Sequence, residues 1–394
     1  GKTTTASMLT SVLREAGLSV VQNRAGANVP AGVASALLEE AGDVGVFEVD
    51  EAWLPLVASQ LAPAVIVLGN LFRDRLDGYG ELDAIASAWA AMASRGHATQ
   101  LVLNADEPLT AMLHDRSSET GRRAPILFGV EDTTVATPEP EHANDAGRCR
   151  RCDGPLHFEA RLLSHLGHYR CSACGGQRPT PDIRASTVHL AGMAGVSFSI
   201  EGSVETSVRL KVPGLHNVYN ALAAVGAATA LGVGASAISR ALAAWTPAFG
   251  RGERIRLGAT ELTVLLMKNP AGANALMRML ADADMAPLTL LLALNDGPAD
   301  GRDVSWIWDA DFELLAPHVR TFDCAGQRAD ELALRLKYAG WPTSARTVER
   351  SIAAALDRAL APAPAKLIVL PTYSALLDLY RELARRGWRQ PFWA

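Results

Sequence analysis

Short apolar runs alternate with longer helical segments twice along this chain, and no other feature constrains the fold as strongly. In the first third of the chain, helical segments separate the runs VGVFEV, PAVIVLGN and QLVLNAD. Near the C-terminus they separate LTLLLALN and KLIVLP. Apolar runs of this length joined by helices are typical of parallel sheets with crossover helices. The sequence therefore predicts two α/β regions.

We place the two domains at residues 1–253 and 254–394, and the chain of 394 residues has room for both. Between Ser186 and Val212 the pattern becomes β-like. A hydrophobic content of 49% with 20% charged residues indicates a globular protein with a substantial core. No apolar run approaches the roughly 18 residues that span a bilayer, and no signal peptide is recognisable. We expect a cytoplasmic protein.

Four of the five cysteines form two C-x2-C pairs, Cys149 with Cys152 and Cys171 with Cys174, separated by eighteen residues. Each pair suits a tight turn that directs two sulfurs at one ion, and four thiolates complete a tetrahedral zinc site. Such a site has no open position for water, which indicates structural zinc. We predict a zinc ribbon inserted at about residues 145–180. Clustered thiols of this kind also favour a reducing compartment.

The three histidines between the cysteine pairs are interpreted as surface or packing residues: His157, His165 and His168. The fifth cysteine, Cys324, lies in an apolar strand and is interpreted as a core residue. Zinc ribbons often bind nucleic acid, but the net charge of −5 provides no basic footprint for it. A modest contrary hint is the group Arg148, Arg150, Arg151, Arg161, Arg170 and Arg178.

The first residues, GKTTT, match the second half of the phosphate-binding loop G-x-x-x-x-G-K-[ST]. In such a loop Lys2 reaches the outer phosphates and Thr3 offers its hydroxyl to Mg²⁺, while amides at the helix start hold phosphate oxygens. The competing interpretation is a helix start that the threonines merely cap. If the loop interpretation holds, the preceding strand and half of the loop are missing from this sequence.

A phosphate site of this type also needs an acidic residue at the end of a buried strand. VGVFEVDEA offers Glu48, Asp50 and Glu51, and strand alternation puts the first two on one face. Either could bind the metal, or both could simply solvate the strand end. Further polar residues follow strands at Asn70 and Asn104, where ligands bind in open α/β sheets.

The motifs GKTTT, E-V-D-E, N-x-x-x-D, N-A-D-E, G-x-H-N-x-x-N-A-x-A-A and G-R-x-E occur in this order. The series resembles the Mur ligase superfamily, ATP-dependent carboxylate–amine ligases of peptidoglycan synthesis to which folylpolyglutamate synthase is related. The resemblance implies a P-loop central domain followed by a C-terminal Rossmann-like domain. It also implies contacts with ATP or Mg²⁺ for Gly1, Lys2, Thr3, Thr4, Glu48, Asn217 and Arg251.

The chain departs from ordinary Mur ligases in three places. Arg75 stands where they have histidine, KNPAG replaces D-Y-A-H-x-P, and the four-cysteine segment is additional. With NRAGAN and ADGRDVSW, these departures resemble the MurT family, the ligase-like subunits of lipid II isoglutaminyl synthase. That resemblance covers essentially the whole chain. It implies ATP-dependent amidation of the D-glutamate α-carboxylate of lipid II to D-isoglutamine, at the inner face of the membrane.

The resemblance further implies a GatD-like glutaminase as the second subunit of a heterodimer, because no glutaminase domain is recognisable here. Members of the family are thought to lend that subunit an aspartate. Asp303 matches the position, with Asp300 and Asp296 as nearby alternatives. Such an aspartate could hold a partner histidine in the correct tautomer. The competing interpretation is that these aspartates cap a turn before Trp306.

Two other functions stay open on the sequence alone. One is a different Mur-type ligase that adds an amino acid or glutamate without a glutaminase, against which the missing D-Y-A-H-x-P argues. The other is a regulatory NTPase whose zinc ribbon binds nucleic acid, which would require a basic face on the ribbon. The first differs from amidation in its amine substrate.

Overall fold

The computed structural model divides into two compact units, and each is described here by itself. The first covers residues 1–246 apart from Arg73–Gly78 and Glu141–Ala143, which belong with Pro247–Ala394 to the second. The structure describes the chain except residues 24–25, 74–81, 96–97, 115–122, 138–139, 144, 248–249, 283–286 and 391–394, and except the side chains of Arg251 and Ala345.

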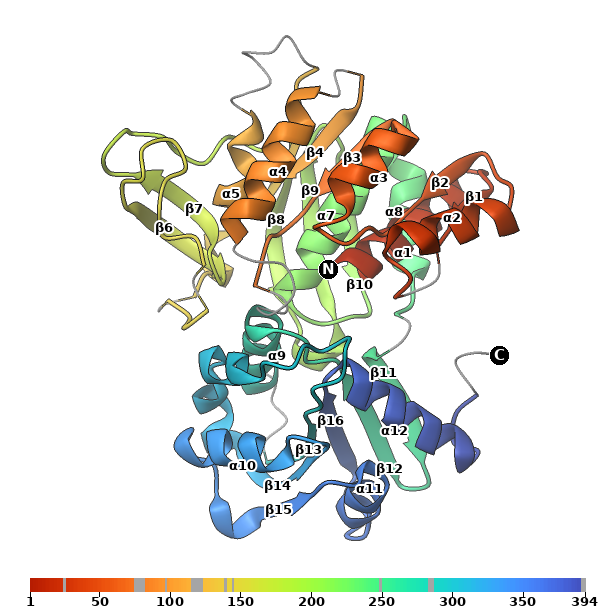
Figure 1. Cartoon of the computed structure of the whole chain (residues 1–394), viewed down its shortest axis with the longest axis vertical. Coiled ribbons are helices and arrows are strands. Elements are labelled where there is room, and N and C mark those ends of the chain that lie inside the picture. The colour runs from red at the N-terminus through yellow and green to blue at the C-terminus, as the bar shows by residue number, and fades with distance from the viewer. Residues whose placement is uncertain are drawn as a thin grey trace. The chain divides into compact units, whose positions relative to one another are not determined.

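A six-stranded mixed sheet forms the centre of the first unit (Figure 1). Its strands are, in spatial order, β10 (Thr206–Leu210), β9 (Val196–Gly202), β8 (Ile183–Leu190), β5 (Ile126–Val130), β4 (Gln100–Asn104) and β3 (Val65–Leu68). The four strands from β3 to β8 run parallel, whereas β8, β9 and β10 pair antiparallel. The predicted α/β class is confirmed, but the sheet is not purely parallel. The connection between β8 and β9 is too short for a crossover and enforces a hairpin.

Helix α7 (Leu215–Ala230) is buried along most of its length against this sheet. Its sequence is dominated by alanine, and Gly226 allows a close approach. A Cβ atom added there would lie 2.6 Å from Val102 Cγ1 of β4. Helix α1 (Lys2–Glu15) packs on α7, which brings the start of the chain against the middle of the unit.

The other elements of the first unit surround this core. The helices are α2 (Pro30–Glu39), α3 (Leu54–Leu61), α4 (Leu82–Arg95), α5 (Pro108–Ala111) and α8 (Ala235–Ala244), with 3-10 turns η1 (Thr133–Val135) and η2 (Gly192–Ala194). Strands β1 (Val20–Gln22) and β2 (Val44–Val46) form a separate parallel pair. Strands β6 (Leu156–Leu163) and β7 (Leu166–Cys171) form an antiparallel hairpin.

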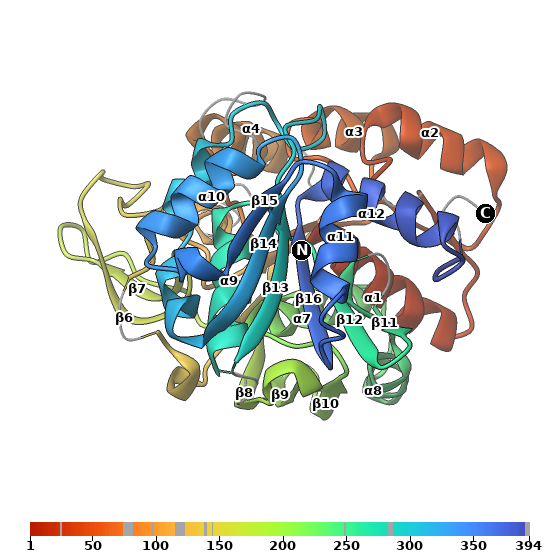
Figure 2. The ribbon, with the colours of Figure 1, turned by 90° about the horizontal axis from the view of Figure 1, so that it is seen from below.

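The second unit contains its own six-stranded sheet (Figure 2). The spatial order is β11 (Arg251–Leu257), β12 (Thr260–Leu265), β16 (Lys366–Pro371), β13 (Leu288–Ala293), β14 (Val319–Ala325) and β15 (Arg346–Glu349). Only the β11–β12 pair is antiparallel, again because two residues join the strands. Continuous apolar sequences such as LTLLLA fit strands covered on both faces.

Helices cover this second sheet. They are α9 (Pro270–Asp282), α10 (Ala329–Tyr338), α11 (Ile352–Leu360) and α12 (Tyr373–Arg385), with 3-10 turns η3 (Ser305–Asp309), η4 (Phe312–His318) and η5 (Thr343–Ala345). Leu356 of α11 and Leu376 of α12 share one hydrophobic core with β12, β13 and β16. Elsewhere Phe322 and Phe312 pack edge-on against Trp341. Within the described ranges, no helix combines the length and apolar character needed to cross a membrane.

Candidate functional site

The β6–β7 hairpin brings the four spaced cysteines together. The Cys149 and Cys174 sulfurs lie 3.7 Å apart, those of Cys152 and Cys171 lie 3.5 Å apart, and all four lie within 4.8 Å of one another. Both pairs sit in tight turns. The amide of Asp153, with φ at +57°, donates to the Cys149 carbonyl, and Gly175 donates likewise to Cys171.

This cluster fits a metal ion. Four thiolates about 2.3 Å from a tetrahedral zinc lie about 3.8 Å from one another, close to the separations observed. The Cys174 amide points at the Cys171 sulfur at 3.5 Å, and this hydrogen bond lowers the pKa of Cys171, whereas burial raises the pKa of Cys149. The four cysteines could therefore hold zinc as a closed, structural site.

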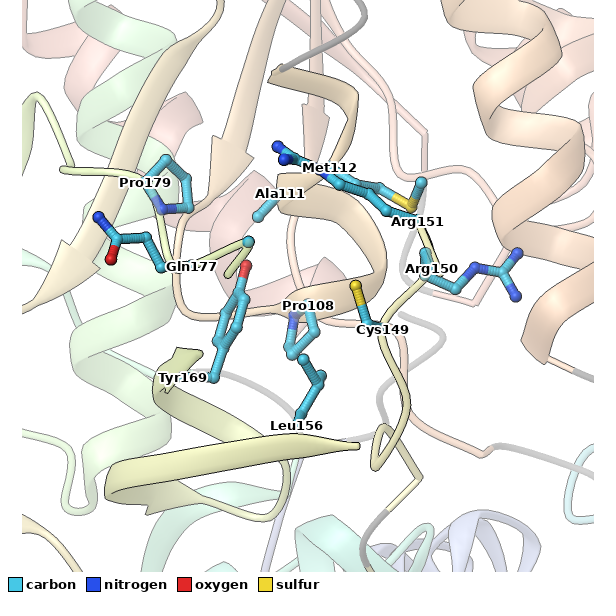
Figure 3. A pocket seen from close by; sticks show the side chains of 11 residues that line it. Pro108, Ala111, Met112, Cys149, Arg150, Arg151, Leu156, Tyr169, Gln177 and Pro179 are labelled. Carbon is cyan, nitrogen blue, oxygen red and sulfur yellow. The ribbon is translucent and has the colours of Figure 1, made fainter. Parts of the chain in front are cut away.

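A small cavity of about 40 Å³ separates the cysteine end of the hairpin from α5 (Figure 3). Pro108 and Ala111 of α5 face Leu156 and Tyr169 of the hairpin across it, with Cys149 beside them. Sites for drug-sized ligands typically measure hundreds of cubic ångströms. The cavity is a packing gap between the hairpin and the domain, and it is too small for a nucleotide.

Lys2 opens helix α1 and reaches across to an acidic turn after β2. Its Nζ lies 2.5 Å from Glu51 Oε1, and both side chains are partly exposed. The turn is well supported: the Glu51 carbonyl accepts from Trp89 Nε1 at 3.0 Å, and Asn23 bonds the main chain of Glu48 in both directions. Lys2 is thus paired with the Glu51 carboxylate. Because the pair is partly exposed, a phosphate group could replace the carboxylate as the partner of the lysine.

The start of α7 lies directly beside the start of α1. A Cβ atom on Gly1 would lie 3.2 Å from Asn220 Oδ1, and the Thr5 hydroxyl is 3.4 Å from the same oxygen. Asn220 in turn donates to Asn217 Oδ1 at 3.0 Å, and Asn217 donates to the Pro213 carbonyl at 2.7 Å.

Gly214 precedes α7 with φ at +90°, and a Cβ there would collide with the ring of His216. Burial lowers the pKa of His216 to about 4, so this histidine is neutral at pH 7. The N-termini of α1 and α7 therefore lie next to each other. Among the side chains described at these two helix starts, Lys2 is the one that carries a positive charge. Helix N-termini attract anions through their unpaired amides and dipoles, so this corner of the first unit can bind phosphate groups.

The other residues proposed for this site are spread more widely. Thr3 is partly exposed at the start of α1, whereas Thr4 is buried. The Asp50 carboxylate caps the amide of Ala52 and is buried, while Glu48 is half-buried. The Arg251 side chain and residues 74–77 lie outside the described part of the chain. Glu51 is the acid that contacts Lys2.

A second polar group lies at the ends of β4 and β5. The Asp106 carboxylate accepts from Arg178 Nε at 2.5 Å, from the Tyr219 hydroxyl at 2.7 Å and from the Val130 amide at 2.9 Å. Next to it, Glu107 is fully buried. Arg178, one of the six arginines that hinted at a basic face on the insertion, is largely buried by this network.

In the second unit, the carboxylates of the three candidate aspartates differ in their partners and in their exposure. Asp300 accepts from the Ser374 amide at 3.1 Å and from its hydroxyl, and burial raises its pKa. Asp296 pairs with Arg328 at 2.9 Å. Asp303 is exposed and caps the Ser305 amide at 2.8 Å, a bond that lowers its pKa. Asp300 and Asp303 line one small pocket with Lys268 and Trp306.

Sequence reasoning missed the pairing of His165 with Glu107. Both side chains are 0% exposed, and their Nε2 and Oε2 atoms lie 2.8 Å apart. Of the two interpretations of this histidine, surface or packing residue, the structure confirms packing. The glutamate was visible only as the last letter of NADE. No local pattern connects residues 58 positions apart, although a histidine at a hairpin turn flanked by leucines was a signal that this turn is buried.

Two protein-family models match the chain. The Mur ligase middle domain matches residues 1–149, and the MurT ligase C-terminal domain matches residues 266–376. The second match lies within the second unit, and the first lies within the first unit except at Arg73–Gly78 and Glu141–Ala143.

Curated and solved proteins give the same picture. The MurT subunit of lipid II isoglutaminyl synthase (glutamine-hydrolyzing) from Streptococcus pneumoniae is 31% identical over 98% of this chain and 86% of its own. A pseudomurein peptide ligase type C from Methanothermus fervidus aligns with a TM-score of 0.74 at 23% identity, over 98% of this chain and 76% of its own. Folylpolyglutamate synthase of Mycobacterium tuberculosis, solved with ADP and AMPPCP, aligns at 0.66 and 15% identity, over 99% and 90%. The two solved structures show the fold alone.

Proposed function

This chain belongs to the MurT family, and from that membership we propose that it is the ligase subunit of a lipid II isoglutaminyl synthase. It uses ATP to convert the α-carboxylate of D-glutamate in the lipid II stem peptide into a carboxamide. The observation that carries the proposal is the 31% identity to a MurT subunit along 98% of the chain. The convergence of two helix N-termini at Lys2 supports a nucleotide site.

The chemistry requires two displacements. A carboxylate is a poor electrophile, so one of its oxygens first attacks the γ-phosphorus of ATP, and ADP leaves. Ammonia then attacks the carbonyl carbon of the acyl phosphate, inorganic phosphate leaves with the bonding electrons, and the nitrogen loses a proton. Charge builds up on the phosphoryl oxygens in the first step, which is where fixed cations and amide dipoles lower the barrier.

The residues of the first unit suit these needs. Lys2 releases Glu51 and turns to the outer phosphates, while the amides at the start of α1 and Asn217 of α7 approach the nucleotide. Magnesium, held by Thr3 and by Glu48 or its neighbours, would neutralise phosphate charge. Arg251 is our further candidate for a contact with the phosphoryl group. The neutral His216 keeps the start of α7 free of a second side-chain charge.

The cysteine cluster and the second unit complete the assignment. We assign the hairpin as a zinc ribbon inserted in the central domain of residues 1–253, and residues 254–394 as a Rossmann-like C-terminal domain. Four thiolates at near-tetrahedral separations support zinc, and the four parallel pairings among the five strand pairs of the second sheet support the second assignment. Metal content measured by mass spectrometry after extensive dialysis tests the first of these, with one zinc per chain expected.

Ammonia comes from a second, GatD-like subunit. At pH 7 free ammonia is mostly ammonium, which is not nucleophilic, so it has to be produced in a sheltered place. The relative from Streptococcus pneumoniae is named as a subunit of a glutamine-hydrolysing enzyme. We assign Asp303 as the aspartate that this chain lends to the partner's catalytic histidine. Asp300 and Asp296 are engaged by Ser374 and Arg328, whereas Asp303 is exposed and ionised readily.

The experiment uses the protein together with a GatD-like glutaminase supplied as the second subunit. Both are incubated with ATP, Mg²⁺, glutamine and lipid II in membranes, and the lipid is followed by mass spectrometry. The exchange of hydroxyl for amine lowers the mass by about one dalton. A product that forms only when the glutaminase is present supports the proposal, and an added amino-acid mass without it would sink it.

A pair of variants separates the aspartates. Asp303→Asn is expected to lower glutamine-dependent amidation about a hundredfold or more, since loss of the orienting carboxylate leaves a histidine in the wrong tautomer. Added ammonium at high pH should restore the product, because the ligase site is unchanged. Asp300→Asn serves as the control and should retain glutamine-dependent activity. The reverse ranking would move the assignment to Asp300.

A further inference from the structure

The tip of the β6–β7 hairpin is buried although its cysteine end is not. Ser164 and His165 form the turn, and they are 2% and 0% exposed, as are the flanking Leu163 and Leu166 at 4% and 0%. At the other end Cys152 and Cys174 are exposed. Hairpin turns usually lie at the surface because their backbone groups need water. Because this turn is buried in the first unit, its polar groups need hydrogen-bond partners within the protein.

Three contacts fix the tip on the strand ends of the first unit. His165 Nε2 donates to Glu107 Oε2 at 2.8 Å, and the Gly167 amide donates to the Asp106 carbonyl at 3.0 Å. His168 Nε2 donates to the Val130 carbonyl at 2.8 Å. The hairpin therefore touches the chain where β4 and β5 end, rather than a peripheral surface.

Glu107 also bonds the segment that follows β3. The same Oε2 atom accepts the amide of Leu71 at 3.0 Å, while Oε1 accepts the amide of Leu109 at 3.0 Å. Phe72 packs its ring edge-on against the imidazole of His165, with centroids 5.0 Å apart. The main chain at Leu71 and the side chain of Phe72 are thus both held by the histidine and its carboxylate.

The segment held in this way lies where ligands bind in open α/β sheets. Leu71 and Phe72 directly follow Asn70, whose Oδ1 accepts from Asn104 Nδ2 of β4 at 2.7 Å. The carboxyl ends of adjacent parallel strands form the ligand-binding edge of such a sheet. The path from the hairpin tip to this edge runs through two side chains, His165 and Glu107.

We infer that His165 is a positioning residue for the reaction: through Glu107, the tip of the cysteine hairpin fixes residues 70–72 at the substrate edge of the sheet. The hairpin is then a brace for that edge as well as a metal-binding insertion. The catalytic consequence rests on the proposed function, whereas the positioning itself does not. It can be measured on the protein without substrate.

Hydrogen–deuterium exchange tests the positioning directly. The substitution His165→Leu removes the imidazole that donates a hydrogen bond to the Glu107 carboxylate. Since the same carboxylate accepts from the Leu71 amide, we expect this amide to exchange about tenfold faster or more. His165→Gln retains a donor and should restore most of the protection. His157→Leu, a substitution at an exposed position on the same hairpin, should leave the amide unchanged. Amides of α7 near Asn220 provide the internal reference.

The outcomes separate positioning from simple loss of structure. Faster exchange at Leu71 with an unchanged α7 and unchanged zinc content supports the inference. Equal acceleration of α7, or no change at Leu71, overturns it.

Kinetics on the assembled enzyme add the catalytic consequence. His165→Leu should lower kcat about tenfold while KM for ATP stays within twofold, because the Lys2 site lies on α1 and α7. Rescue by His165→Gln is expected. A fall in kcat that is matched by loss of ATP affinity and of zinc would overturn the positioning role. If the unaltered enzyme fails to amidate lipid II, the proposed function fails, and the exchange result still decides the inference.

Discussion

Two cation–carboxylate pairs in the first unit have the same chemistry and opposite surroundings. Arg178 and Asp106 are 11% and 0% exposed, and the carboxylate also accepts from Tyr219 and Val130. Lys2 and Glu51 are 31% and 20% exposed, at the start of a helix. The first pair is enclosed by bonded neighbours, whereas the second borders solvent at the corner where we propose that phosphate binds.

The difference teaches how one kind of contact can serve two purposes. A buried charge has lost its hydration, so it depends on every partner that replaces water, and separating the pair is costly. A partly exposed pair contributes little to stability because water can replace either partner. In the nucleotide site that we propose, Lys2 would therefore exchange Glu51 for a phosphate at small cost, whereas separating Arg178 from Asp106 would be costly. We accordingly expect the enclosed pair to matter for stability and the exposed pair for turnover.

The largest effect is expected from breaking the enclosed pair. Arg178→Met leaves the Asp106 carboxylate buried with its charge uncompensated, and we expect a loss of about 3–5 kcal/mol in the free energy of unfolding. Guanidinium denaturation measures it. Arg148→Met is the matched control, since Arg148 and Asp153 are an exposed pair whose loss should cost less than about 1 kcal/mol. Similar losses for both variants would contradict the comparison.

Removing the open cation should affect turnover and not stability. Lys2→Met is expected to lower ATP-dependent amidation about a hundredfold to a thousandfold, because a charge that stabilises the transferring phosphoryl group is lost. The unfolding free energy should change by less than about 1 kcal/mol. Initial rates at saturating ATP and denaturation curves measure the two quantities. Lys211→Met, at an exposed lysine of the same unit, is the control. A large stability loss with normal turnover would assign Lys2 to the framework.

A smaller loss of stability is expected when the hydroxyl of Tyr219, a neutral partner of Asp106, is removed. Tyr219→Phe removes the hydroxyl that donates to Asp106, and we expect the free energy of unfolding to fall by about 1–2 kcal/mol. Burial and the Asp106 carboxylate raise the pKa of Tyr219, so the phenol stays protonated as the donor. Denaturation at several pH values between 6 and 9 should show a constant difference. A difference that varies across this range would mean that a group titrates in the network.

Features that depend on residues close together in the sequence could be predicted from the sequence. Spacing alone identifies Cys149, Cys152, Cys171 and Cys174, because a metal site of two C-x2-C pairs is encoded by short-range turns. The alternation of apolar runs and helices likewise predicts the α/β class, and the lysine of GKTTT stands at the start of a helix as expected. In each of these cases the residues that determine the feature lie within a few positions of one another or repeat with a fixed period.

Pairings over long distances in sequence could not be predicted. Lys2 pairs with Glu51, 49 positions away, a contact that no local pattern indicates. His165 reaches Glu107 only because the hairpin folds back onto the sheet. The sequence predicts β structure between Ser186 and Val212 but not that these strands pair antiparallel, since the pairing follows from the lengths of the connections. Topology, which brings such residues together, is not contained in local periodicity.

The smallest expected effect comes from a pair in the second unit that is open on one side. His142 is 70% exposed and bonds Asp311, and this hydrogen bond raises the pKa of the histidine. The folded pKa is above the unfolded value of about 6.5, so the pair stabilises fully below that pH and its contribution disappears as pH rises through the folded pKa. Exposure limits the gain to about 0.5 kcal/mol. His142→Gln should therefore reduce stability near pH 5.5 and leave it unchanged near pH 9. His189→Gln, at an exposed histidine of the first unit, controls for loss of a surface imidazole. A loss larger at pH 9 than at pH 5.5 would reverse the sign and show that burial, not Asp311, governs His142.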